Sequence, residues 1–424
     1  MALCFLAILL TPLAAAGLAL IHTGLSRSRN ASHMMLSCLC VFGVAAIVFF
    51  VIGFAWQGYP GRPAHAFVAR GKSWNWIASE PFFWRGLRLD GSASSLAALL
   101  GMMSAGVAAI IPLGSGADRW RLGSACASTA LLAGWTYPLF AHWIWGGGWL
   151  AQLGANYGLG QGFVDSGGAA TVQAVGGLTA LAVTWVLGPR RGKYTADRMP
   201  LAIPGHNAVL VTLGCFLAWL GWIGLDCGGA ILFTGADAGR SPLVVANATL
   251  AAASAILCVA AITRVRFGKP DASLCANGWV GGLVASSAGC AVMSPAAAMI
   301  VGLVAGAVVI YGVEWLELHL TIDDPSGSIS VHLLSGLWGV FAVGWLGRAP
   351  QGQDGSSQWV AQLVGIATLL GFVLPVTYGL NWLLNRLYPM RARPEGERQG
   401  LDLHELGAGA YPDFMSHNDE FGQR

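Results

Sequence analysis

Long apolar stretches dominate this sequence and limit what it can fold into. Eleven of them are long enough to cross a hydrocarbon layer about 30 Å thick. They lie near residues 3–22, 34–56, 94–113, 122–144, 168–188, 205–225, 243–263, 273–291, 295–314, 328–347 and 357–384. The stretches are continuous rather than alternating, which disfavours a transmembrane β-barrel. We therefore predict an all-α membrane protein with eleven transmembrane helices.

The composition agrees with a membrane protein and excludes other classes. Only 10% of the 424 residues are charged, against about 25% in soluble domains. A chain with 55% hydrophobic residues is not disordered, and a net charge of +3 provides no basic surface for nucleic acid. The 59 glycines are typical of close helix packing in a bilayer. The nine cysteines form no CxxC pair, so we expect no disulfide or zinc framework.

The positive charges predict an orientation. Sixteen Lys and Arg residues lie in one set of loops and the C-terminal tail, and seven lie in the opposite loops. Because Lys and Arg favour the cytoplasmic side, we predict a plasma (inner) membrane protein with its N-terminus outside and its C-terminus in the cytoplasm. Residues 1–388 would form the transmembrane domain and residues 389–424 a cytoplasmic tail. The aromatic-rich loop 57–93 would lie outside, as an interfacial belt.

Two segments share one residue pattern at identical offsets. The matching positions are Asp165, Gly168, Val172, Gln173 and Gly177 in the first, and Asp324, Gly327, Val331, His332 and Gly336 in the second. The predicted helices that follow run in opposite directions through the membrane. This predicts an inverted repeat of helices 1–5 and 6–10 followed by a long eleventh helix, with a substrate site near the midplane. A chance similarity is the alternative.

The repeat places one polar side chain of each helix near the centre of the membrane. At 1.5 Å per residue, Gln173 and His332 lie about 12 Å into their helices. Unpaired polar groups are costly there, so both are candidate functional residues; for His332 the alternative is a satisfied core histidine. Asp165 and Asp324 stand where carboxylates cap helix N-termini. Capping alone is the alternative to a functional role for either aspartate.

A series of short motifs, in this order, resembles the ammonium transporter, methylammonium permease and Rhesus protein family over nearly the whole chain. The motifs are Pro12 with Gly24-Leu25, His142-Trp-Ile-Trp145-Gly-Gly-Gly148, Gly188-Pro-Arg-Arg-Gly-Lys-Tyr194, Gly205-His-Asn207, Gly221-Trp222-Ile-Gly224, Gly268-Lys-Pro-Asp271, Asn277-Gly278, Ser294-Pro295, Asp323-Asp324-Pro325 through His332, Gly400-Leu-Asp402 and Ala410-Tyr-Pro-Asp413-Phe. Each motif alone is weak, and their joint order is specific.

The resemblance implies a homotrimer with a narrow pore through each protomer. Ammonium would be recruited at an outer mouth, deprotonated, and passed largely as ammonia, because a bare cation in an apolar pore is far more costly than a neutral molecule. Trp145 matches the cation–π residue of the mouth, and Asp165 matches a buried aspartate that favours the cation. Trp222 belongs to the helix-six signature of the pore. Gln173 and His332 occupy the positions of two stacked pore histidines.

The chain departs from this pattern at the pore. Gln173 replaces the first histidine; it can pair with its neighbour but cannot titrate. Ser104 and Leu225 replace two gating phenylalanines, and Gly229 replaces a mouth serine. These changes predict a wider throat with weaker cation–π binding.

Two further departures add polar groups. Asp226 replaces an asparagine of helix six, and we expect it either to attract cations at the mouth or to be a solvated loop acid. His22 replaces a tyrosine near the mouth, where the alternative is an interfacial histidine.

The leading functional hypothesis is an ammonium/ammonia transporter. A non-transporting ammonium sensor and a pore for another small neutral solute are the alternatives. The sequence has no recognisable nucleophile–base pair, Walker loop or metal cluster, so we expect neither an enzyme nor a bound cofactor or metal. The tail resembles the family segment that contacts neighbouring protomers and, in many bacterial members, a trimeric PII signal protein.

Overall fold

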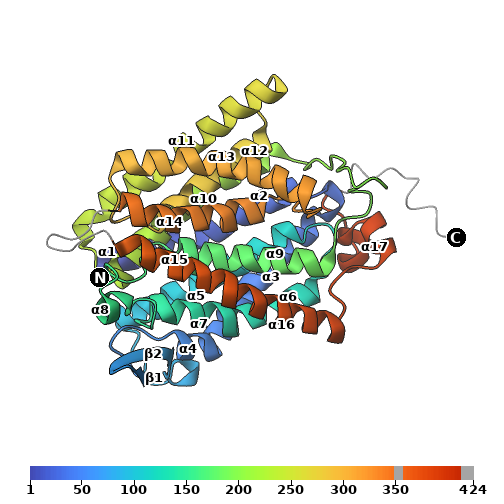
Figure 1. Ribbon diagram of the computed structural model, residues 1–424. Helices are drawn as coiled ribbons and strands as arrows, with labels where there is room; N and C mark the ends of the chain where they lie inside the picture. The colour runs from blue at the N-terminus through green and yellow to red at the C-terminus, as the bar shows by residue number, and fades with distance from the viewer. Residues whose placement is uncertain (348–356, 412–424) are drawn as a thin grey trace.

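The computed structural model describes residues 1–347 and 357–411. This part of the chain is predominantly helical, and its long helices run alongside one another (Figure 1). Nine of its helical segments are long and apolar enough to cross a membrane: Ala2–Leu25, Ser28–Gln57, Ala93–Ser115, Ala169–Leu187, Ala208–Phe233, Ala238–Phe267, Pro295–His319, Ile329–Leu346 and Gln358–Leu387. The protein is therefore built as a multi-pass membrane bundle.

Many of these segments contain more than one helical element. The α-helices are α1 (Ala2–Leu10), α2 (Pro12–Leu25), α3 (Ala31–Val48), α4 (Phe54–Gln57), α5 (Ala93–Ser115), α6 (Leu122–Leu131), α7 (Tyr137–Ile144), α8 (Leu153–Tyr157), α9 (Val175–Leu187), α10 (Ala208–Phe233), α11 (Ser241–Phe267), α12 (Ala272–Ser287), α13 (Pro295–His319), α14 (Ser335–Leu346), α15 (Gln358–Thr368), α16 (Leu374–Leu387) and α17 (Pro394–Gln399). Short π-helical segments adjoin them at η2 (Phe49–Gly53), η4 (Leu132–Thr136), η5 (Ala169–Ala174), η7 (Ile329–Leu334), η9 (Leu369–Val373) and η10 (Asp402–Leu406). The 3₁₀ turns are η1 (Ser28–Asn30), η3 (Phe82–Trp84) and η6 (Ala238–Arg240).

The two remaining apolar stretches are also helical. The stretch 122–144 forms α6, η4 and α7, and the stretch 273–291 contains α12, which has only 16 residues. The sequence misplaced one boundary that matters for the site. The helix predicted to end near residue 225 continues as α10 to Phe233, because the residues beyond 225 stay packed against the bundle instead of entering a loop.

A β-hairpin corrects the expectation of a purely helical chain. Antiparallel strands β1 (Ala64–Ala69) and β2 (Lys72–Ala78) lie within the segment taken as an aromatic loop. Arg70 and Gly71 both have positive φ, as a two-residue hairpin turn requires. Trp74 and Trp76 pack on Tyr157 and Trp143, with ring centroids 5.3 and 5.0 Å apart. These aromatic side chains attach the hairpin to the bundle, so they do not form a simple belt.

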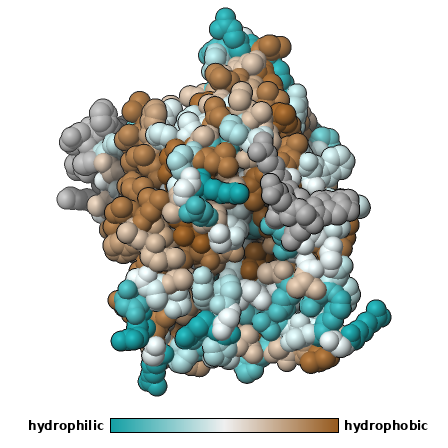
Figure 2. Space-filling view, turned by 90° about the vertical axis from the view of Figure 1, so that its left-hand side faces the viewer, coloured by the Kyte–Doolittle hydropathy of each residue, from teal (hydrophilic) through white to brown (hydrophobic). Residues whose placement is uncertain are grey.

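The bundle has two ends of different composition, named here the hairpin end and the tail end. The hairpin end carries β1, β2 and α8, and the tail end carries α17 and η10 at the opposite side of Figure 1. Figure 2 views the hairpin end, where hydrophilic residues gather along the lower part and hydrophobic residues cover much of the upper left.

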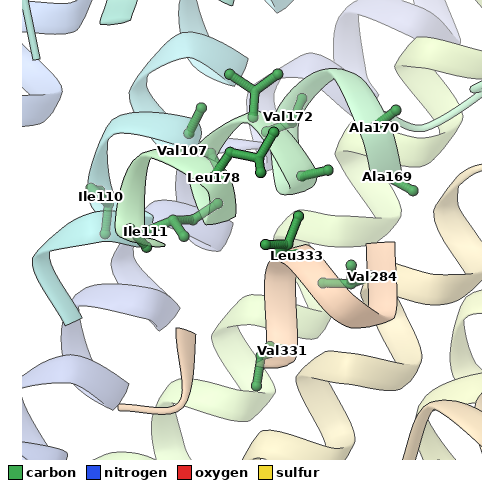
Figure 3. Packing of buried hydrophobic residues seen from close by; sticks show 14 of the residues in the cluster. Val107, Ile110, Ile111, Ala169, Ala170, Val172, Leu178, Val284, Val331 and Leu333 are labelled. Atoms are coloured by element: carbon green, nitrogen blue, oxygen red, sulfur yellow. The ribbon is translucent and has the colours of Figure 1, made fainter. Parts of the chain in front are cut away.

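The centre of the bundle is a tightly packed junction of α5, η5, α9, α12 and η7. Figure 3 shows its apolar side chains, among them Ile111, Val172, Val284 and Leu333, and all four are buried. Elsewhere α2 and α10 approach so closely that a Cβ at Gly221 would overlap the backbone of Ala14. Small residues at helix contacts are the usual means of such packing in membranes.

Candidate functional site

Gln173 and His332 form a buried hydrogen-bonded pair at this central junction. Oε1 of Gln173 lies 2.8 Å from Nδ1 of His332, and both side chains are almost fully buried. Gln173 comes from η5 and His332 from η7, the π-helical segments that lead into α9 and α14. The structure thus brings together the two side chains that the repeat pattern paired. Trp222 of α10 stacks on the imidazole, with centroids 6.3 Å apart and an interplanar angle of 30°.

Asp165 holds the first of these segments from its N-terminal side. Its Oδ2 accepts hydrogen bonds from the backbone N–H groups of Ala170 and Thr171, at 3.1 and 2.7 Å, and from the Thr171 hydroxyl at 2.8 Å. Its Oδ1 has no hydrogen-bond partner among the described residues, although the side chain is buried. Asp165 therefore caps η5 with one oxygen and leaves the other unused.

Asp324 holds the second segment in a similar way but with both oxygens engaged. Oδ2 accepts from the backbone N–H of Ile329 at 2.7 Å, and Oδ1 accepts from the N–H of Ser328 at 3.1 Å and the hydroxyl of Ser115 at 2.7 Å. Both aspartates are caps, as the sequence suggested. Only the carboxylate of Asp165 keeps an open oxygen.

The backbone conformation explains why both segments have a glycine three residues after the aspartate. Gly168 and Gly327 have φ of 91° and 70°, in the left-handed region that other residues avoid. This turn lets the chain reverse between each aspartate and the helical segment that it caps. Asp and Gly three residues apart are therefore needed together.

Trp145 lies at the hairpin end of the bundle. Its indole N–H donates to the backbone carbonyl of Asp165 at 2.8 Å, and its ring stacks on Phe233, with centroids 4.5 Å apart and planes within 8°. Phe233 is the last residue of α10. Sequence reasoning missed it, because it expected both pore phenylalanines to be lost and ended this helix too early.

Asp226 lies on α10 between this aromatic stack and the central pair. It comes four residues after Trp222 and seven before Phe233, which correspond to about 6 and 10 Å along the helix axis. The side chain is fully buried, and neither carboxylate oxygen has a hydrogen-bond partner among the described residues. The alternative of a solvated loop acid is therefore wrong. Oδ1 lies against the backbone of Gly167, where a Cβ would overlap it.

Ser104, Leu225 and Gly229, which stand where the family pattern has other side chains, are all buried. Ser104 lies on α5, with no hydrogen-bond partner for its hydroxyl among the described residues. Leu225 packs in an apolar cluster with Leu96 and Leu100. Close packing explains the glycine at position 229, because a Cβ there would overlap the carbonyl oxygen of Ser166. A serine at position 229 would therefore not fit between α10 and this loop.

His22 was expected near the outer mouth, and this expectation is wrong. The side chain is at the C-terminal end of α2, where its Nε2 lies 3.4 Å from the hydroxyl of Ser328, next to η7. It lines a small cavity together with His332. The histidine lies towards the tail end because α2 begins at the hairpin end and His22 is near its last turn.

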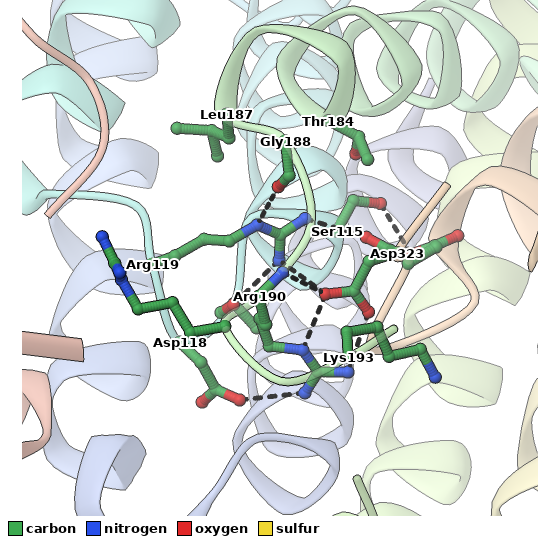
Figure 4. Close-up of polar contacts among 12 residues, drawn as sticks. Ser115, Asp118, Arg119, Thr184, Leu187, Gly188, Arg190, Lys193 and Asp323 are labelled. Atoms are coloured by element: carbon green, nitrogen blue, oxygen red, sulfur yellow. Dashed lines mark hydrogen bonds and ion pairs between the residues drawn. The ribbon is translucent and has the colours of Figure 1, made fainter. Parts of the chain in front are cut away.

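Charged residues at the tail end fix the loop that carries Asp324 (Figure 4). The guanidinium of Arg190 donates to both carboxylate oxygens of Asp323, with both contacts at 2.9 Å, and to Asp118 at 3.0 Å. Arg119 donates to the carbonyl oxygens of Asp323 and Gly188 at 2.8 and 2.7 Å. Burial alone would raise the pKa of Asp323, but Arg119 and Arg190 outweigh it and lower this pKa to about 2. The arginines keep Asp118 and Asp323 ionised, and their contacts hold the loop that leads into η7.

The described part of the tail returns to the bundle. The carboxylate of Asp402 accepts from the backbone N–H groups of Ser32 and His33, at 3.2 and 2.7 Å, and so caps α3. His206 lies 3.0 Å from the hydroxyl of Tyr411. The rest of the last predicted motif, residues 412–414, lies outside the described residues.

These features define a class of protein: a multi-pass membrane transporter with a series of buried polar and aromatic groups through its helical bundle. The profile of the Ammonium Transporter Family matches residues 1–411, and the chain belongs to this family.

Individual relatives match this chain over most of their length. The chain is 34% identical to Ammonium transporter Amt2 of Archaeoglobus fulgidus, over 94% of this chain and 85% of that one. It is 30% identical to Ammonium transporter of Bacillus subtilis, over 97% and 98%. Among solved structures it is similar to a Sensor Amt Protein, with a TM-score of 0.84, 28% identity, and coverage of 95% and 96%.

Proposed function

We propose that this protein transports ammonium across a membrane, taking up the cation at the hairpin end and passing ammonia through the centre of each protomer. The observation that carries the proposal is the buried Gln173–His332 pair, which joins two capped helical segments at mid-bundle. The family membership supports the same substrate.

The chemistry of the pair favours ammonia over ammonium. A glutamine carbonyl oxygen only accepts hydrogen bonds, so Nδ1 of His332 donates and its Nε2 is left as an acceptor. The unpaired Nε2 of Gln173 is a donor. Ammonia has both N–H groups and a lone pair, so it can use both sites. Ammonium has no lone pair and cannot accept from the glutamine.

The hairpin end has the groups that would attract and hold the cation. The stacked rings of Trp145 and Phe233 offer a cation–π surface worth about 1–2 kcal/mol. Below them, the open oxygen of Asp165 and the two oxygens of Asp226 are unused hydrogen-bond acceptors among the described residues, to which an ammonium ion could donate. Together these groups would lower the energy of the cation up to the point where it loses its proton.

The proposal includes a membrane topology. All eleven apolar stretches are helical, so we infer eleven crossings in residues 1–388, with an inverted repeat of helices 1–5 and 6–10 and a long eleventh helix. The matched Asp165 and Asp324 caps support the repeat. The hairpin end would face outwards from the plasma membrane, and residues 389–424 would form a cytoplasmic tail, as the distribution of positive charge predicts.

Two partners follow from the family resemblance. The protein would form a homotrimer, which mass measurement in detergent would test. The tail, docked on α3 through Asp402 and on His206 through Tyr411, would offer a site for a PII-type regulatory protein. Deleting residues after 390 and measuring PII binding tests this second expectation.

Uptake of ammonium or methylammonium into liposomes tests the function. The wild type should accumulate substrate, and Asp165→Ala should abolish uptake because it removes both the cap and the charge. Asp271→Ala is a matched control, because Asp271 caps α12 through the N–H of Leu274, at 2.8 Å, away from the central pair. No uptake by well-folded wild-type protein would refute transport.

Electrophysiology would show what the glutamine does. Under an ammonium gradient, Gln173→His should change the net charge moved per ammonium, because a second imidazole can relay protons. If the wild type binds ammonium by calorimetry but moves none, the protein is instead a sensor. Because the chain is similar in fold to the Sensor Amt Protein, binding and transport should both be measured on the same preparation.

A further inference from the structure

A small cavity lies beside His332, towards the tail end. It is enclosed by α2, α12 and the segment leading into η7, and its polar lining consists of His22, Asn277, Ser326, Ser328 and His332. The space open to the centre of a water-sized molecule is about 10 Å³, which is room for about one such molecule.

His22 has one ring nitrogen engaged and one unused. Its Nε2 lies 3.4 Å from the hydroxyl of Ser328, which in turn lies 2.6 Å from the hydroxyl of Ser326. Its Nδ1 has no hydrogen-bond partner among the described residues, although the side chain is only 2% exposed. A buried polar atom of this kind normally has a partner.

His332 faces the same cavity with its hydrogen-bonding role already fixed. Its Nδ1 donates to Gln173, so its Nε2 carries a lone pair. The cavity is therefore bracketed by two imidazoles from different helices. Asp324 caps the turn at Ser328 and so fixes the third side of the cavity.

We propose that His22 and His332 together bind one ammonia molecule in this cavity and that His22 is a pore residue of this transporter. Ammonia donates a hydrogen bond to the lone pair of one imidazole. It forms a second hydrogen bond, as donor or acceptor, with the other imidazole or with Ser328. Position 173 has no imidazole, and in this proposal His22 provides the second pore imidazole, closer to the tail end than Gln173. This inference rests on the proposed transport function.

Three substitutions of His22 test the site in ammonium-uptake assays on liposomes. His22→Phe keeps the ring but removes both nitrogens, and should lower ammonium uptake about tenfold, as expected for the loss of one or two hydrogen bonds. His22→Gln keeps a donor and an acceptor and should restore uptake to within about threefold of the wild type. His33→Phe, at a buried histidine of α3 bound to Glu405, is the matched control and should transport normally.

The size of the cavity provides an independent measurement. His22→Ala enlarges a site that holds one ammonia, so it should raise the ratio of methylammonium to ammonium uptake. Normal ammonium uptake by His22→Phe, with an unchanged ratio in His22→Ala, would overturn the inference and leave the cavity as a site for a resident water. Lack of uptake by the wild type in the same vesicles would instead refute the proposed function.

Discussion

Buried carboxylates at the two ends of the bundle are stabilised in opposite ways. At the tail end, Asp118 and Asp323 contact the guanidinium groups of Arg27, Arg119 and Arg190. At the hairpin end, no ion pair among the described residues includes Asp165 or Asp226.

The presence or absence of an arginine partner distinguishes carboxylates that stabilise the structure from carboxylates that are available to a substrate cation. A buried carboxylate bound to arginine has its charge already balanced, so it serves the scaffold. A buried carboxylate without such a partner leaves negative potential that a mobile cation can satisfy. The same residue type thus fixes loops at one end and favours cations at the other, and the two ends should respond differently to loss of charge.

The largest effect should come from Asp323→Asn, which leaves two buried guanidiniums with reduced compensation. We expect a loss of about 3–5 kcal/mol in the free energy of unfolding at neutral pH. Chemical unfolding in detergent measures it, and Asp197→Asn, at an exposed loop acid, is the control. The pKa of Asp323 is lowered from 3.8 to about 2. Its stabilisation is therefore present above about pH 4 and disappears as the pH falls towards 2.

Asp165→Asn separates the effect of the carboxylate charge from the effect of the helix cap. The amide keeps an acceptor for Ala170 and Thr171 but loses the charge, so methylammonium uptake at low concentration should fall about tenfold or more, equivalent to at least ~1.4 kcal/mol. The matched variant at the other segment, Asp324→Asn, should change uptake less than about threefold. Equal losses in both variants would mean that both aspartates act only as caps.

Asp226→Asn should have the opposite sign to Asp323→Asn in the unfolding measurement. Replacing a buried carboxyl group that has no hydrogen-bond partner among the described residues should raise the free energy of unfolding by about 1–2 kcal/mol. Apparent ammonium affinity should fall in the same variant. A destabilised Asp226→Asn would show that this carboxylate has a stabilising partner, and the contrast between the two ends would fail.

The sequence predicted a multi-pass helical bundle because its apolar signals are strong and local. Long apolar runs located the helices, and the matching residue pattern of the two segments correctly paired Gln173 with His332. The aspartate caps followed from the same spacing. These are properties of periodicity and chain direction, which depend little on tertiary contacts.

What the sequence missed depends on packing between distant segments. The sequence left Asp226 as either a cation-attracting residue or a solvated loop acid because the predicted helix ended near residue 225, whereas α10 continues to Phe233 and buries this carboxyl group beside Gly167. The pairing of Arg190 with Asp323 joins residues far apart in the chain, and the positive-inside count treated that arginine only as a loop charge. His22 was misplaced because its assignment relied on resemblance, although the predicted direction of its helix already placed it at the other end.

The smallest effect should come from Phe233→Leu, which removes one ring from the aromatic stack at the hairpin end. One cation–π contact contributes about 0.5–1 kcal/mol, so KM for methylammonium should rise about twofold to fivefold. The maximal rate should change little, because the central pair is untouched. Phe341→Leu is the control, since Phe341 packs on Trp338 of α14, with centroids 6.3 Å apart. An unchanged KM would mean that Phe233 only supports the position of Trp145, and that the carboxylates alone attract the cation.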